Sequence, residues 1–255
     1  MTAAVRALRR AGRLLRTERA LWPWAAIPFA LNALAFGLAV WVFATHFEAV
    51  SAPLVRVLEV PRPTSWAGWL LAVPLWALAW CVRAVLLAAF ALAIYASFTL
   101  VGGVIAAPFL DALSARVERL AGGPEVEPPR GLAAALRHAG RCMREEAKRV
   151  GFFVGVQLVL AALGFVPGLA PFAAAAALLF SALFLPLDYT GFALDRREVP
   201  FAARRRWVLA HRFEMLAFGG FALALYAVPG LSFVCLPWLV SAGTLLVLEL
   251  GAPAR

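Results

Sequence analysis

The four-residue sequence Val-Pro-Gly-Leu occurs twice, at residues 166–169 and 228–231, and each copy lies inside a long uncharged segment. The first segment covers residues 151–187 and the second covers residues 215–248. Matching Gly/Pro interruptions in two apolar segments are typical of broken helices around a transport site. The sequence therefore predicts two helical hairpins whose turns are formed by these repeats.

Such a turn could bind an anion with backbone groups alone. The first N–H groups of a helix have no partner within it and carry roughly half a positive charge. Helices that begin near Phe172 and Leu236 would present these groups next to the turns. Gly168 and Gly230 would allow an anion to approach closely, and Ser232 would add a hydroxyl. The alternative is that the repeats form tight turns and bind nothing.

The helices of both hairpins are expected to be short. They have 13 to 16 residues each, which corresponds to about 20–24 Å at about 1.5 Å per residue. The hydrocarbon core of a bilayer is about 30 Å thick, so we expect hairpins that enter the membrane without crossing it. The four helices are expected at residues 151–165, 172–187, 215–228 and 236–248.

The composition predicts a membrane protein. Of the 255 residues, 64% are hydrophobic, and the mean hydropathy is +0.84, well above a typical soluble domain. The fold class expected is an all-α integral membrane protein with two long transmembrane helices, two short hemi-penetrating hairpins and amphipathic interfacial helices. It forms one membrane domain, 1–255: amphipathic helix 1–19, span 20–45, span with an apolar extension 63–110, amphipathic helices 111–149, hairpin 150–187, basic connector 188–214 and hairpin 215–248.

The charge pattern predicts the topology. The net charge is +10, and the basic residues flank the apolar blocks, where they favour the cytoplasmic side and anionic lipid. Segments 1–19, 111–149 and 188–214 are the basic ones, so an even number of crossings separates them and both termini are expected in the cytoplasm. This distribution indicates the lipid bilayer as a partner and does not indicate nucleic acid.

Two polar residues interrupt the predicted spans. Asn32 lies in the first, where it could bond a neighbouring helix or contact a substrate. Arg83 is the one charge in residues 63–110. An intramembrane arginine is a functional candidate, although snorkelling or pairing with a carboxylate explains it equally well.

Three amphipathic helices are expected outside the spans. The first is expected at residues 2–19, with Thr2 as its cap and its arginines on one face. Such a helix could anchor the protein in the plane of the lipid headgroups, or its arginines could form a basic funnel that collects substrate. A helix beginning at Pro108 has Leu110, Leu113, Val117 and Leu120 on its apolar side and Asp111 and Glu118 on its wet side, and it ends at Gly122-Gly123. In residues 131–150, Glu145 is placed to pair with Arg141 and Arg149 at i±4. The arginines of the first helix are Arg6, Arg9, Arg10, Arg13 and Arg16.

The sequence contains no familiar catalytic motif. It has no P-loop, no HExxH, no GxSxG and no dinucleotide fingerprint. Its three histidines are scattered, and its three cysteines lack metal-ligand spacing. We therefore expect no enzyme activity, no catalytic residue, no metal site and no cofactor.

Residues 105–118, Ile-Ala-Ala-Pro-Phe-Leu-Asp-Ala-Leu-Ser-Ala-Arg-Val-Glu, resemble the signature of the CysZ sulfate permeases and the related etoposide-induced proteins. Residues 187–189, with Asp195-Arg196-Arg197, resemble the stretch between that family's hairpins. The resemblance implies two spans, two hemi-penetrating hairpins, a homo-oligomer and a role in sulfate uptake across the bacterial inner membrane. The motif residues it singles out are Pro108, Phe109, Asp111, Glu118, Asp188 and Tyr189.

Two functions remain open at this stage. The first is a transporter or channel for a small oxyanion, sulfate or sulfite. The second is a membrane scaffold or assembly protein without transport.

The sequence departs from the family pattern at one place. Sulfate permeases of the family have arginines just ahead of the first span, whereas residues 20–23 here are Ala-Leu-Trp-Pro and the nearest arginines are Arg16 and Arg19.

Overall fold

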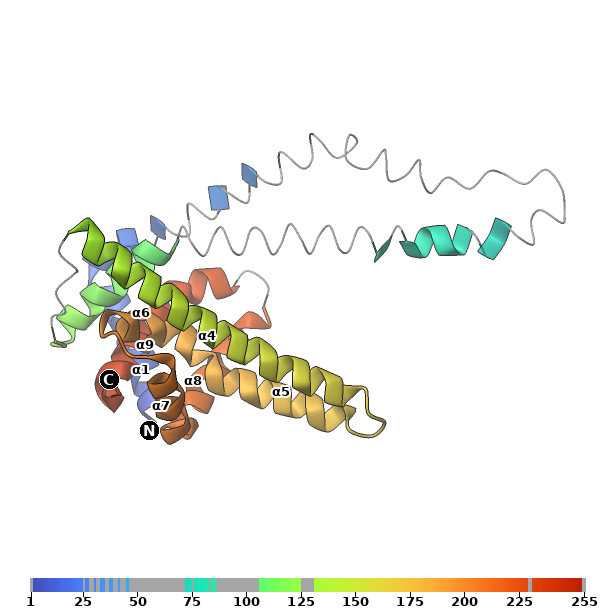
Figure 1. The fold of residues 1–255 in the computed structure, drawn as a ribbon. Coiled ribbons are helices and arrows are strands. Elements are labelled where there is room, and N and C mark those ends of the chain that lie inside the picture. The colour runs from blue at the N-terminus through green and yellow to red at the C-terminus, as the bar shows by residue number, and fades with distance from the viewer. Residues whose placement is uncertain are drawn as a thin grey trace. The chain divides into compact units, whose positions relative to one another are not determined.

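The chain forms two compact units, and the computed structural model describes most of the first and a smaller share of the second. One unit consists of Met1–Ile27 with Pro108–Arg255, and the other of Pro28–Ala107. All regular structure in the described residues is helical (Figure 1), which confirms the predicted all-α class. The described residues are 2–24, 26–27, 30, 33–34, 37–38, 41, 45, 72–74, 76–82, 84–85, 106–124, 131–228 and 231–253. The predicted spans 20–45 and 63–110 therefore lie largely outside them.

Helix α1 (Ala3–Thr17) confirms the predicted N-terminal amphipathic helix. Its small apolar side packs on α9 (Leu231–Leu250). Thr2 precedes the helix in extended conformation, without the predicted side-chain cap bond. Helix α9 thus covers the apolar side of α1, and the location of α1 in the headgroup plane stays a prediction. The buried residues of α1 are Ala3, Ala4, Ala7, Leu8 and Ala11.

The helix through Pro108 is helical from residue 106 to residue 120 in the described chain. Leu113 and Val117 are fully buried, as the apolar stripe predicts, but Leu120 is half exposed. Glu118, predicted on the wet side, is buried. That prediction was wrong because it considered one helix alone, whereas partners distant in sequence surround the carboxylate. The helix ends as predicted, with Gly122 at a φ of 75°.

Helix α4 (Leu132–Gly164) is one helix of 33 residues. The predicted division at residue 150, into an amphipathic helix and a short hairpin helix, was wrong. The sequence changes from an amphipathic to an apolar pattern near this residue, but the helix continues without a break. Gly151 and Gly155 lie in open surroundings inside it, and no proline occurs there to interrupt the backbone hydrogen bonds.

Helix α5 (Ala170–Phe184) returns beside α4, as Figure 1 shows, and α6 (Pro186–Arg196) follows. Aromatic rings join α4 to α5, with Phe152 5.9 Å from Phe180 and 5.4 Å from Phe184 between ring centroids. The predicted first hairpin is therefore present; its first helix is longer than expected, and its second, with 15 residues, is close to the predicted length.

Helices α7 (Phe201–Ala210) and α8 (Arg212–Tyr226) meet at a bend of 96°. Helix α9 then runs for 20 residues with Pro237 inside it. The short helix predicted at residues 236–248 is thus longer, and residues 239–247 lie in the core of the unit. Glycines allow close helix crossings: a Cβ on Gly219 of α8 would lie 1.8 Å from the Ala182 carbonyl oxygen, and one on Gly243 of α9 would lie 2.7 Å from the Tyr189 carbonyl carbon.

Two helical segments among the described residues are long and apolar enough to cross a membrane: Leu136–Gly164 and Ala170–Arg196, with 29 and 27 residues. At about 1.5 Å per residue both exceed a hydrocarbon core of about 30 Å. The uncharged part of the first begins only after Arg149 and is about 22 Å long by the same rise. The exposed surface of both segments is apolar, because Leu158, Phe172 and Leu178 are largely exposed. Phe165, directly after the first segment, is exposed as well.

Candidate functional site

A cluster of two arginines and two carboxylates joins the 106–120 helix to α6. Arg196 contacts the Asp111 carboxylate at 2.5 Å and the Glu118 carboxylate at 2.7 Å. Arg197 pairs with the second oxygen of Glu118. The formal charges of the four groups cancel, and the Glu118 side chain is only 4% exposed. A buried charge needs such partners, because desolvation without them is costly.

Helix α9 contributes the hydroxyl group of Thr244 to the same cluster. Ser114 and Thr244 share a hydrogen bond of 2.7 Å and are fully buried. Arg196 also donates to the Ser114 hydroxyl at 2.9 Å. The cluster therefore ties together three helices that are far apart in sequence, beside the close approach of Gly243 to Tyr189.

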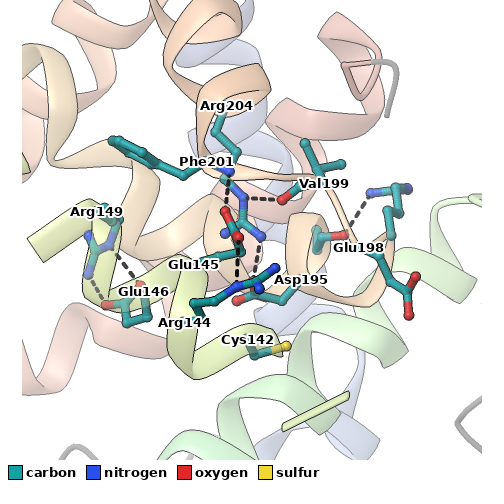
Figure 2. Close-up of polar contacts among 12 residues, drawn as sticks. Cys142, Arg144, Glu145, Glu146, Arg149, Asp195, Glu198, Val199, Phe201 and Arg204 are labelled. Atoms are coloured by element: carbon teal, nitrogen blue, oxygen red, sulfur yellow. Dashed lines mark hydrogen bonds and ion pairs between the residues drawn. The ribbon is translucent and has the colours of Figure 1, made fainter. Parts of the chain in front are cut away.

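A second polar centre lies where α4 meets the start of α7 (Figure 2). The buried carboxylate of Glu145 accepts the Phe201 backbone N–H at 2.8 Å and pairs with Lys148 at 2.6 Å. Pro200, the residue before α7, has no side-chain cap, so Glu145 supplies a cap from another helix. The predicted i±4 pairs of Glu145 were wrong.

Arg204 is the other member of this centre. It is buried, donates to the Val199 carbonyl at 2.8 Å and pairs with Asp195 (Figure 2). It belongs to the Arg204–Arg206 run of the basic connector 188–214, which the charge pattern predicts on the cytoplasmic side. In the folded protein, Arg204 is buried and stabilises the turn between α6 and α7.

A cavity of about 270 Å³ lies among α4, α5, α6 and α8. Its lining is mostly aromatic and aliphatic, with Arg149, Asp188 and Ser181 as polar members. Arg149 pairs with Asp188 and with Glu146, and Gln157 donates to the Ser181 hydroxyl at 2.8 Å. The cavity thus has one ion pair and a hydroxyl in an otherwise apolar wall, in which every polar group named is already bonded.

The remaining motif residues have packing contacts. Phe109 lies 6.3 Å from Trp24 between ring centroids. Tyr189 is buried, its ring lies 5.8 Å from that of Phe218, and its hydroxyl donates to the Tyr226 hydroxyl at 3.1 Å. Pro108 is exposed. The motif therefore marks residues that join helices within the unit.

The predicted anion site is described only in part. Gly168 has a φ of 83° and open surroundings, as a left-handed turn requires. In the turn, Leu169 donates to the Val166 carbonyl at 3.0 Å. Asn32, Arg83 and Gly230 lie outside the described residues, and only the backbone of Ser232 is described, within α9.

Several residues of the two polar centres were absent from the sequence-based set. Arg204 and Thr244 give no local signal, since they contact residues outside their own helices, and Glu145 was predicted to pair only within its own helix. Ser114 was visible in principle, because it lies between Leu113 and Val117 on a stripe that is otherwise apolar. Within the described ranges, no group of three or more His, Cys, Asp or Glu side chains could hold a metal ion.

Long helices with exposed apolar side chains, joined by buried ion pairs, define a polytopic α-helical membrane protein. The family model described as sulfate transporter CysZ/etoposide-induced protein 2.4 matches residues 7–237. The chain belongs to this family, as the motif at residues 105–118 predicts.

Individual relatives agree with that assignment. A protein named sulfate transporter CysZ from Pseudomonas paraeruginosa is 28% identical over 219 residues, or 86% of this chain and 84% of that protein. Its namesake from Pectobacterium atrosepticum is 27% identical over 219 residues, covering 86% and 74%. One from Pseudomonas syringae pv. tomato is 30% identical over 164 residues, so that the match spans 64% of this chain and 65% of the relative.

Proposed function

We propose that this protein is a transporter or channel for a small oxyanion, with sulfate as the leading substrate and sulfite as the next. The observation that carries the proposal is the family match over residues 7–237. Relatives named sulfate transporter CysZ that align over most of the chain support sulfate in particular. The role is non-enzymatic and needs no cofactor.

The proposed permeation path uses backbone groups at the hairpin turns. The left-handed Gly168 supports this proposal, because its open surroundings leave room for an anion beside the start of α5. Gly230 and Ser232 would contribute the equivalent turn before α9. Asn32 and Arg83 would contribute polar groups from the spans. The hairpins enter the membrane without crossing it in this proposal, which the short uncharged part of α4 supports.

The proposed setting is the inner membrane of a bacterium, with both termini in the cytoplasm and several copies in one assembly. The basic segments 1–19, 111–149 and 188–214 support this orientation, because cytoplasmic segments are enriched in Lys and Arg.

Influx of ³⁵S-labelled sulfate into vesicles containing the purified protein tests the proposal. We expect influx above that of empty vesicles, reduced by unlabelled sulfate and sulfite and unaffected by chloride at equal ionic strength. Gly168→Ala should lower the influx, because an L side chain at this φ strains the turn. Gly164→Ala, four residues earlier in open surroundings within α4, is the matched control and should leave influx unchanged. The proposal fails if sulfate, sulfite and phosphate all show no influx.

A scaffold without transport is the second candidate. The observation that favours it is that Asp111, Glu118 and Asp188 are all engaged in ion pairs within the unit. Purification from membranes of the native host distinguishes the two candidates. A partner protein at fixed stoichiometry, together with vesicles that show no influx, would support the scaffold.

A further inference from the structure

A groove of about 390 Å³ lies between α1 and the C-terminal part of α9. Helix α1 contributes arginines and Ala7 to its lining, and α9 contributes a buried leucine and a glutamate. None of the lining residues belongs to either polar centre or to the turn at Gly168. Its principal lining residues are Arg6, Arg9, Arg10, Arg13, Leu245 and Glu249.

Specific hydrogen bonds hold α1 in the orientation that forms the groove. The Ala4 backbone N–H donates to the Glu214 carboxylate at 3.0 Å. The Trp238 indole N–H donates to the Leu8 carbonyl at 2.8 Å, and Gly12 lets that indole lie close to the helix. With its apolar side fixed on α9, the helix exposes its arginines to the surroundings. The packing of α1 on α9 therefore holds the arginines of α1 on this surface.

The groove has more positive than negative charge. Helix α1 contains five arginines and no acidic residue. Glu249 is the one carboxylate among the lining residues, and it pairs with Arg6. Arg10 and Arg13 form no ion pair with any described residue. Arg10 and Arg13 thus offer two guanidinium groups without a carboxylate partner among the described residues, and an anion bound between them would balance their charge.

We propose that this groove binds the phosphate headgroup of an anionic phospholipid. Guanidinium groups bind phosphate oxygens through paired hydrogen bonds. Leu245 and Ala7 line the floor of the groove but are 2% and 1% exposed, so the arginines provide most of the surface that a ligand would contact. Trp22, which follows the short 3-10 helix Arg19–Leu21 after α1, is 61% exposed and donates to the Leu15 carbonyl. Such exposed tryptophans are typical of the headgroup level of a membrane.

Native mass spectrometry of the full-length protein with matched-chain phosphatidylglycerol and phosphatidylcholine tests this proposal. We expect about tenfold tighter binding of phosphatidylglycerol, since each arginine near an anionic lipid surface is worth about 1 kcal/mol. The variant R10Q/R13Q should lose most of this preference. The control R16Q/R19Q removes the same charge outside the groove and should change binding less than twofold. R10K/R13K should lie between the wild type and R10Q/R13Q, because lysine keeps the charge without the paired donors.

Three results would overturn the proposal. Equal losses in R10Q/R13Q and R16Q/R19Q would mean a general charge effect. Equal binding of the two lipids would mean that the groove does not distinguish between their headgroups. Displacement of the lipid by millimolar sulfate, with chloride at equal ionic strength inactive, would mean that the groove takes a free oxyanion. All three readouts are independent of sulfate influx, so they stand whether or not the protein transports sulfate.

Discussion

Arginines serve two different purposes in this molecule. Arg196, Arg197 and Arg204 are mostly buried, and each pairs with a carboxylate from its own unit. Arg10 and Arg13 of α1 are exposed and have no such pair. The comparison teaches that basic residues flanking apolar blocks are not one class: some hold helices together, and others remain available to anions outside the protein.

The largest expected effect comes from crowding the helix crossing beside the buried cluster. Gly243→Ala would place a Cβ 2.7 Å from the Tyr189 carbonyl carbon, and backbone cannot move aside cheaply. We expect a loss of about 4 kcal/mol or more, the range of severe core substitutions, seen as failure to purify as a monodisperse protein. The control Gly12→Ala on α1 meets Trp238 at an ordinary 3.4 Å. It should retain or slightly raise the unfolding temperature. Equal tolerance of both substitutions would contradict the tight α6–α9 crossing.

Removing a buried arginine is expected to be the next most damaging change. Arg196→Met leaves Asp111 and Glu118 with less compensation, at a cost of about 3 kcal/mol. Thermal unfolding in detergent should show a midpoint lowered by about 6–12 °C. The control Arg16→Met removes an exposed arginine and should shift the midpoint far less. Similar shifts for the two variants would remove the distinction between the arginine classes.

Loss of the cap on α7 should have an intermediate effect. Glu145→Ala removes the acceptor of the Phe201 N–H, which costs about 1–2 kcal/mol for a helix cap. Glu145→Gln keeps an acceptor oxygen and should retain more stability. Hydrogen exchange of the first turn of α7 measures this directly. Unchanged protection in Glu145→Ala would show that the bond does not stabilise the helix.

The smallest expected effect is that of the exposed arginines on folding. R10Q/R13Q should alter the free energy of unfolding by less than about 0.5 kcal/mol, as is usual for surface substitutions, although the same variant should lose lipid preference. Denaturation by titrated detergent measures this free energy. A loss of stability comparable to that of Arg196→Met would show that α1 also depends on its arginines for folding.

Local patterns in the sequence predicted much of the fold. The arginine row predicted α1, the stripe of Leu113 and Val117 predicted the buried side of the 106–120 helix, and the first Val-Pro-Gly-Leu repeat predicted the turn at Gly168. These features depend on residues within a few positions of one another, so a single helical period or turn motif reveals them.

The candidate site was harder to predict from the sequence, because its contacts join residues that are far apart along the chain. Glu118 was placed on the wet side although Arg196 and Arg197, nearly eighty positions later, make its burial possible. Glu145 was paired along its own helix, whereas its structural partner is the backbone of Phe201. The 33-residue length of α4 was missed because a change of polarity at residue 150 resembles a boundary without containing a helix breaker.

The most direct test of this account is a double-mutant cycle between Arg196 and Glu118, measured as free energies of unfolding in one detergent. The variants are Arg196→Met, Glu118→Gln and their combination. Because the two side chains are in contact and mostly buried, we expect a coupling energy of about 1 kcal/mol or more. Additive losses, with coupling within about 0.3 kcal/mol of zero, would contradict the claim that this motif holds the helices together.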